Sequence, residues 1–203
     1  MHPGLQASID RAVAAIGAID AERRALLDEL ASFVSSARRR AEGAQLTFIC
    51  THNSRRSQMG QLWAAAAAAH FGVDGVFTHS GGTEVTAFHP NAVAAMRRAG
   101  FVLDASDGEN PHYSVSYSAE APAIDCFSKV YDDPRNPSRG FAAIMTCSEA
   151  DEACPVVLGA ALRVPLRYED PKSADGSADE AAVYDERSMQ IATEMLYLFS
   201  EVH

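Results

Sequence analysis

Residues 46–69 have the sequence LTFICTHNSRRSQMGQLWAAAAAA, which predicts a strand, a polar loop and a helix in immediate succession. The β-branched and aromatic run at the start is typical of a buried strand, and it ends at Cys50. The alanine-rich segment beyond the loop predicts a helix over residues 57–71. The strand therefore brings a cysteine, and the loop brings Arg56, to the start of a helix.

Strand patterns continue to alternate with helix patterns along the chain. The sequence predicts further strands at 75–80 (GVFTHS), 141–146 (FAAIMT) and 162–166 (LRVPL), and helices at 89–99 and 178–202. Gly100 is expected to close the first of these helices, and Ser177 with Glu180 has the form of a capping box that opens the second. The alternation predicts an α/β fold with a doubly wound, mostly parallel sheet and helices on both faces.

Two segments do not fit this alternation. Residues 111–118 and 123–131 predict an inserted hairpin, and residues 1–43 predict an N-terminal helical extension of the α/β domain at 44–203. Asp20 is expected to cap the second helix of the extension, with Arg38, Arg39 and Arg40 in its last turn. Because these helices are amphipathic, they must cover either their own domain or a partner chain, so a homodimer through them is possible.

Composition limits the class of protein. A chain of 203 residues that is 47% hydrophobic can bury one good core, and its net charge of −10 argues against nucleic acid as a partner. We expect no secretion signal and no membrane span, because the sequence lacks the required apolar runs. In the cytoplasmic setting that this implies, the four cysteines favour catalytic or metal-binding thiols over structural disulfides.

The loop after Cys50 has the features of an oxyanion site. A loop that enters a helix N-terminus directs backbone N–H groups and the positive end of the helix dipole inward, which suits a tetrahedral anion. Arg56 would clamp two anion oxygens with its planar fork, and the same field would stabilise a Cys50 thiolate. Asn53 tolerates the left-handed conformation that a tight loop needs. The expected oxyanion-binding residues are Thr51, His52, Asn53, Ser54, Arg55, Arg56 and Ser57.

The segment CTHNSRRSQM resembles the active-site loop of the low-molecular-weight protein tyrosine phosphatases and, more closely, that of thioredoxin-coupled arsenate reductases with the same fold. The resemblance covers roughly residues 45–200 and implies that Cys50 is the nucleophile and that Arg56 binds the oxyanion. His52 stands where the family usually has glycine. Arg55 stands where it often has a second cysteine, and it would add positive charge at the mouth of the site.

The resemblance also implies a proton donor. The family uses an aspartate before a proline on the loop preceding the last helix, and RYEDPKS supplies Asp170 and Pro171 in that place. An aspartate near a bound oxyanion would stay protonated long enough to act as a general acid. The simpler interpretation of Asp-Pro is an ordinary turn, and Glu169 is a second candidate for the donor.

The segment CSEADEAC, residues 147–154, distinguishes the two activities. Cys147 follows a predicted strand and so should open on the same sheet edge as Cys50. Cys147 and Cys154 resemble the redox pair of the arsenate reductases, which implies a disulfide that passes from Cys50–Cys147 to Cys147–Cys154. They could instead be two unrelated buried cysteines, whereas their spacing is unusual for zinc. Cys126 has no counterpart in the family and is interpreted as a packed thiol.

The sequence therefore predicts an arsenate reductase that needs no cofactor and no metal. Its substrate would be a small oxyanion, arsenate or a phosphate ester, and its reductant thioredoxin or another thiol. One alternative is a low-molecular-weight protein tyrosine phosphatase that works through a phosphocysteine. Another is a non-catalytic oxyanion-binding module, in which His52 and Arg55 prevent turnover.

Overall fold

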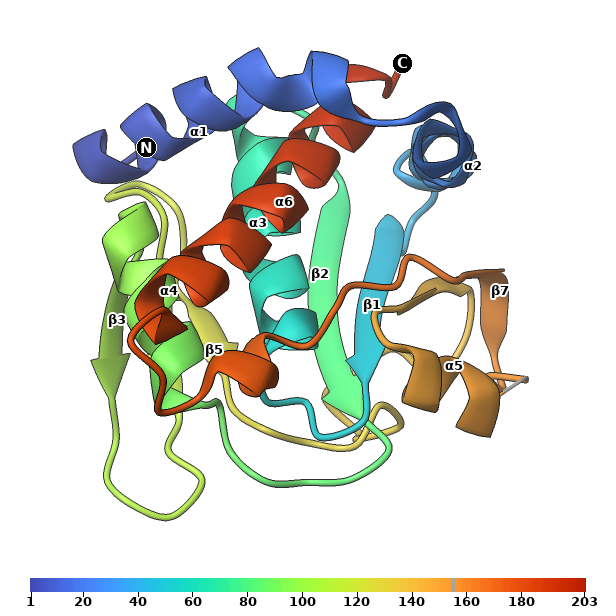
Figure 1. Ribbon diagram of the computed structural model, residues 1–203. Helices are drawn as coiled ribbons and strands as arrows, with labels where there is room; N and C mark the ends of the chain where they lie inside the picture. The colour runs from blue at the N-terminus through green and yellow to red at the C-terminus, as the bar shows by residue number, and fades with distance from the viewer. Residues whose placement is uncertain (155) are drawn as a thin grey trace.

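A four-stranded parallel sheet forms the centre of the computed structural model, which describes residues 1–154 and 156–203 (Figure 1). Its strand order is β2-β1-β6-β7, and the strands are β1 Ala44–Cys50, β2 Val76–Gly82, β6 Phe141–Met145 and β7 Ala160–Val164. This confirms the predicted parallel α/β sheet. The last strand lies two residues earlier than LRVPL suggests, and it stops before Pro165 because proline has no N–H to donate to a sheet ladder.

The helices surround the sheet and mostly match the predicted ones. They are α1 Pro3–Ala15, the 3-10 helix η1 Ile16–Ala18, α2 Ala21–Ala37, α3 Arg56–His70, α4 Pro90–Ala99, α5 Ser148–Ala153, the 3-10 helix η2 Pro171–Ala174 and α6 Glu180–Ser200. Asp20 caps α2 as expected, since its carboxylate accepts the Arg23 N–H at 2.8 Å.

Two expectations about helix ends are wrong. Helix α2 ends at Ala37, so Arg38, Arg39 and Arg40 follow its last turn rather than lie in it. No capping box opens α6: the Glu180 carboxylate accepts the Gly176 N–H at 2.7 Å, one residue before Ser177. The N-cap of α6 is Asp179 rather than Ser177, so Glu180 is the first residue of the helix and not the third.

The two faces of the sheet bury different clusters. Alternate residues of β1 face opposite ways, so Phe48 joins the large core under α3 and α6, while Ile49 joins a smaller cluster beneath α5. The smaller cluster contains Cys50, Cys147 and Ala150, with Cys154 packed against it. Helices therefore cover both faces, and the short helix α5 lies over the face that carries the cysteines.

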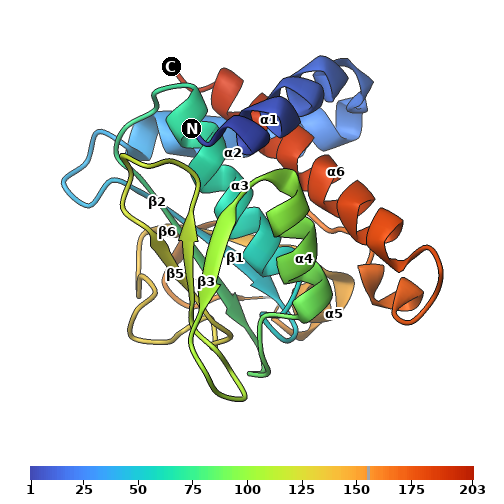
Figure 2. The ribbon, with the colours of Figure 1, turned by 90° about the vertical axis from the view of Figure 1, so that its left-hand side faces the viewer.

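The inserted hairpin belongs to a second sheet. Strands β4 Tyr113–Ser116 and β5 Ile124–Cys126 pair antiparallel, which confirms the hairpin. The third strand of this sheet is β3 Val102–Ala105, which pairs with β4 and was not predicted from the sequence (Figure 2). Among its four residues only Leu103 is buried, so the apolar pattern of β3 is too short to recognise.

The N-terminal extension packs against its own chain. Residues of α1 and α2 enter the same core as α3 and α6: Leu5, Ile9, Ala12, Leu27, Leu30 and Val34 are fully buried there. Gly100 permits the close approach of α1 to the end of α4, since a Cβ atom at this position would lie 2.2 Å from the Leu5 nitrogen. Because the apolar faces are covered within the chain, the predicted homodimer is left without support.

No helix within the described residues combines the length and apolar character needed to cross a membrane.

Candidate active site

The loop between β1 and α3 is held rigidly by the segments around it. Asn53 has a φ of 46°, the left-handed conformation predicted for this residue. Its Oδ1 accepts the Lys129 N–H at 3.0 Å, while the Ser128 hydroxyl donates to the His52 carbonyl at 2.8 Å. A Cβ atom at Gly82 would lie 2.6 Å from the Thr51 carbonyl oxygen, so this glycine lets β2 end against the loop. The insertion and β2 thus fix the loop's backbone.

Cys50 lies at the base of the loop, with only 3% of its surface exposed. Its Sγ is 3.1 Å from the Ser57 Oγ, and that oxygen accepts a hydrogen bond from the Asn53 Nδ2 at 2.8 Å. Since the amide nitrogen can only donate, Ser57 Oγ acts as an acceptor toward Asn53, and its own proton is free to point at the sulfur.

Arg56 begins α3 and is 6% exposed. Its Nη1 donates to the Tyr168 carbonyl at 2.9 Å, and its Nη2 donates to the Asp170 carboxylate at 2.6 Å. In the described part of the chain, its buried Nε has no hydrogen-bond partner. A buried donor without a partner is costly, and an oxyanion in the loop would supply the missing acceptor.

Asp170 caps η2 and contacts the loop arginine Arg56. One oxygen contacts Arg56 and the other accepts the Lys172 N–H at 3.1 Å, which caps η2 and fixes the carboxyl group. Glu169, the second candidate, has a side chain that is 93% exposed and lies 3.6 Å from Arg187. The structure therefore brings Asp170, rather than Glu169, into contact with Arg56.

Arg55 has two partners of its own. It donates to the Tyr184 hydroxyl at 2.6 Å and to the Asp175 carboxylate at 2.8 Å, and it is 9% exposed. Burial, together with the hydrogen bond to Asp175, raises the pKa of Tyr184 to about 12, so this hydroxyl stays protonated. The charge of Arg55 is thus balanced by a carboxylate. The His52 side chain is 45% exposed and lies 3.5 Å from Glu84.

Cys147 lies between Cys50 and α5. It caps α5, its Sγ accepting the Ala150 N–H at 3.4 Å, and it lies 3.5 Å from the Thr51 hydroxyl. Burial raises the pKa of the Cys147 thiol, an effect that the bonds from Thr51 and Ala150 partly offset. Cys154 closes the same helix and is half-buried. Three cysteines are thus gathered around one apolar cluster.

Cys126 lies apart from this group. It is fully buried in the large core, and burial raises the pKa of its thiol to about 12.

Several residues that hold the site together were not identified from the sequence. Tyr168 accepts the Arg56 hydrogen bond, and Asp151 of α5 forms ion pairs with both Arg163 and Arg167. Arg163 also donates to the Asp151 carbonyl at 2.7 Å and to the Cys154 carbonyl at 3.1 Å. These contacts join residues of different elements, and no local pattern in the sequence signals them.

Comparison with known sequences finds related enzymes. The sequence profile of the family described as low molecular weight phosphotyrosine protein phosphatase matches residues 45–113. An arsenate reductase of Brevibacillus brevis is 30% identical over 61% of this chain and 74% of its own length. One from Bacillus licheniformis is 27% identical over 76% of this chain and 93% of its own length.

Solved structures share the fold at low sequence identity. A low-molecular-weight phosphotyrosine phosphatase from Vibrio cholerae O395 has a TM-score of 0.52 at 12% identity, over 78% of this chain and 95% of its own. A structure described as an arsenate reductase in the phosphate binding state has a TM-score of 0.50 at 19% identity, over 79% of this chain and 99% of its own. The chain belongs to the low-molecular-weight phosphotyrosine protein phosphatase family, as an enzyme whose curated relatives include arsenate reductases.

Proposed function

We propose that this chain reduces arsenate to arsenite through the thiols of Cys50, Cys147 and Cys154. The observation that carries the proposal is that these three cysteines lie around one apolar cluster, with the charge of Arg56 near enough to act on Cys147. A phosphatase of this fold needs only the first of them. The relay requires reduced thiols, which the predicted cytoplasmic setting would maintain.

Arsenate binding is the first step. The backbone N–H groups of residues 51–57 and the Nε of Arg56 would hold its oxygens, at the start of α3 where the helix dipole favours an anion. The Cys50 thiolate attacks arsenic and an arsenic-bound hydroxyl leaves as water, once protonated. This step joins sulfur to arsenic but does not yet change the number of electrons on arsenic.

Electron transfer follows in the second step. The Cys147 thiolate attacks the Cys50 sulfur, so that an S–S bond forms and the S–As bond breaks. The bonding pair leaves with arsenic, which departs as arsenite, reduced by two electrons, while two thiols become one disulfide. Cys154 then attacks Cys147 and releases the Cys50 thiolate. A dithiol reductant, thioredoxin or another thiol, would reduce the Cys147–Cys154 bond.

Phosphate ester hydrolysis is a second candidate activity. The contact between Asp170 and Arg56, at 2.6 Å, supports it, because a carboxyl group beside Arg56 would lie near a leaving-group oxygen that needs a proton. Hydrolysis would use Cys50, Arg56 and Asp170 and would leave Cys147 and Cys154 unchanged.

One arsenate turnover without added reductant separates these activities. Reduced protein is mixed with one equivalent of arsenate, its thiols are then trapped by alkylation, and disulfides are located by mass spectrometry. Arsenate reduction predicts one arsenite per chain and a Cys147–Cys154 disulfide. If no arsenite forms while aryl phosphate is hydrolysed, the chain is a phosphatase. If neither reaction occurs, the site only binds oxyanions.

Asp170→Asn is expected to slow hydrolysis of aryl phosphates with poor leaving groups by about 10²-fold or more, because these depend most on a protonated donor. Good leaving groups should be affected far less. Glu169→Gln is the matched control, since it removes an adjacent but exposed carboxylate. Rates are compared across aryl phosphates of graded leaving-group pKa, and the same dependence in Asp170→Asn and wild type would assign the acid role to another group.

A further inference from the structure

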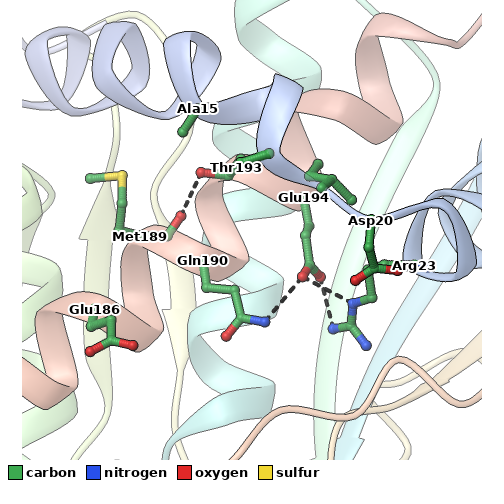
Figure 3. A pocket seen from close by; sticks show the side chains of 10 residues that line it. Ala15, Asp20, Arg23, Glu186, Met189, Gln190, Thr193 and Glu194 are labelled. Atoms are coloured by element: carbon green, nitrogen blue, oxygen red, sulfur yellow. Dashed lines mark hydrogen bonds and ion pairs between the residues drawn. The ribbon is translucent and has the colours of Figure 1, made fainter.

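Arg23 of α2 forms a buried ion pair with Glu194 of α6 (Figure 3). Its Nε and Nη2 donate to the two carboxylate oxygens at 2.9 and 2.8 Å, and the two side chains are only 16% and 4% exposed. The pair borders a pocket of about 620 Å³ between η1 and α6, whose lining includes no residue of the Cys50 loop. This ion pair thus fastens the N-terminal extension to the last helix.

Tyr168 connects the ion pair to the candidate active site. Its hydroxyl donates to Glu194 at 2.7 Å, and the Arg23 guanidinium lies 4.6 Å from the centre of its ring. Burial raises the pKa of Tyr168 well above its usual value, so the phenol stays protonated and able to donate. The Tyr168 side chain is therefore held by Arg23 at its ring face and by Glu194 at its hydroxyl group.

The backbone of Tyr168 reaches the oxyanion arginine. Its carbonyl accepts the Arg56 hydrogen bond at 2.9 Å, and its N–H donates to the Thr146 carbonyl, one residue before Cys147, at 3.0 Å. Asp170, two residues later, contacts the same guanidinium. A shift of Tyr168 would thus move both partners of Arg56.

We infer that Arg23 is a positioning residue for the oxyanion site, acting through Glu194 and Tyr168 on Arg56 and Asp170. Residues 1–43 would then help to position the active site of the domain at 44–203, in addition to covering its core. The inference rests on the proposed function for the roles of Arg56 and Asp170.

The test compares Arg23→Met with Arg24→Met. Arg24 is the adjacent residue of α2: it donates to the Ile19 carbonyl at 2.9 Å and lies over the Tyr197 ring at 5.0 Å. Both variants weaken the docking of the extension, but only Arg23 contacts Tyr168 and Glu194. Affinity for inorganic phosphate is measured by calorimetry, and hydrogen exchange is followed over residues 166–172.

Arg23→Met should weaken phosphate binding by about tenfold to a hundredfold, because a small displacement of a binding group is costly. Exchange at the Tyr168 amide should also rise. Arg24→Met should change neither the phosphate affinity nor the exchange, even if its melting temperature falls as much as that of Arg23→Met. Equal loss of phosphate affinity in the two variants would reduce the role of Arg23 to general docking and overturn the inference.

Two more variants extend the test, and the first of them also covers the case in which Arg23→Met fails to fold. Tyr168→Phe keeps the ion pair and removes only the hydroxyl link, and it should also weaken phosphate binding and raise exchange. Arg23→Lys keeps the charge and should restore part of the affinity lost in Arg23→Met. Wild-type properties of Tyr168→Phe would overturn the inference.

These measurements do not depend on turnover. A wild-type protein that binds phosphate but neither reduces arsenate nor hydrolyses aryl phosphate would refute the proposed function. The comparison of phosphate affinities would still decide the inference. If phosphate does not bind, the exchange data alone decide it: equal exchange over 166–172 in Arg23→Met and wild type would overturn it.

Discussion

Cys50→Ser is expected to abolish arsenate reduction and aryl phosphate hydrolysis together, lowering both rates by about 10⁴-fold or more. Both reactions begin with attack by the same sulfur. The sulfur lies 3.1 Å from the Ser57 hydroxyl oxygen, and a serine hydroxyl in its place would stay protonated near neutral pH and be a far weaker nucleophile. Phosphate binding should persist, because the loop N–H groups and Arg56 are unchanged.

Cys126→Ser is the matched control for this prediction. The chemical change is the same, but Cys126 lies in the large core under α3 and α6 and not in the cluster with Cys50. Arsenite release and aryl phosphate hydrolysis should therefore stay near wild type in the Cys126 variant, once its fold is verified by circular dichroism. If Cys50→Ser retained either activity, Cys50 could not be the nucleophile for that reaction.

The strand, loop and helix around Cys50 were predictable because each is encoded locally. A run of β-branched and aromatic residues ends where polar residues begin, and the six consecutive alanines beyond the loop strongly favour a helix. The left-handed conformation of Asn53 was predictable for the same reason: few other residues adopt it at low cost. Local preference and tertiary structure agree here, as they do at Asp20.

The environments of Arg55 and Arg56 could not be predicted. Arg55 meets Asp175 and Tyr184, which lie 120 and 129 residues away, and Arg56 meets Tyr168 at a separation of 112. Nothing in the sequence around the loop distinguishes an arginine paired with a carboxylate from one open to solvent. Such pairs are set by packing of α6 and η2 against the loop.

The acidic segment at 147–154 is held more firmly than its composition suggests. Three acidic residues in eight favour a solvated and loosely held turn. Asp151 is instead 6% exposed, because Arg163 of β7 and Arg167 beyond it approach from the neighbouring chain segments. A segment rich in acidic residues can thus contain one carboxylate that is buried and paired with arginines.

Cys147→Ser is expected to stop arsenate reduction while leaving aryl phosphate hydrolysis near wild type. Without the second thiol, the arsenic bound to Cys50 has no route to a disulfide, so arsenite release should fall to the uncatalysed background. Hydrolysis needs only Cys50, Arg56 and Asp170. Normal arsenite release from this variant would contradict the relay and favour another route for the electrons.

Cys154→Ser separates the two halves of the relay and is measured in the same assay. It should release one arsenite per chain and then stop with a Cys50–Cys147 disulfide, which mass spectrometry can locate. In the proposed relay the wild-type disulfide moves to Cys154, yet α5 separates Cys147 from Cys154 by about 10 Å, at 1.5 Å per residue. A disulfide tolerates Cα separations of only about 4.4 to 6.8 Å. Helix α5 must therefore unwind, breaking the contacts of Asp151 with Arg163 and Arg167.

The pH dependence of the first arsenite release tests which thiol limits it. Burial raises the pKa of Cys147, so little of it is thiolate near neutral pH, and the attack on Cys50 should accelerate as pH rises toward that pKa. Cys154→Ser should show the same rise, because Cys154 acts only after arsenite has left. Rapid-quench measurement of arsenite against pH in both proteins gives the comparison. A rate that is independent of pH between neutral and alkaline conditions would mean that a step other than attack by Cys147 limits arsenite release.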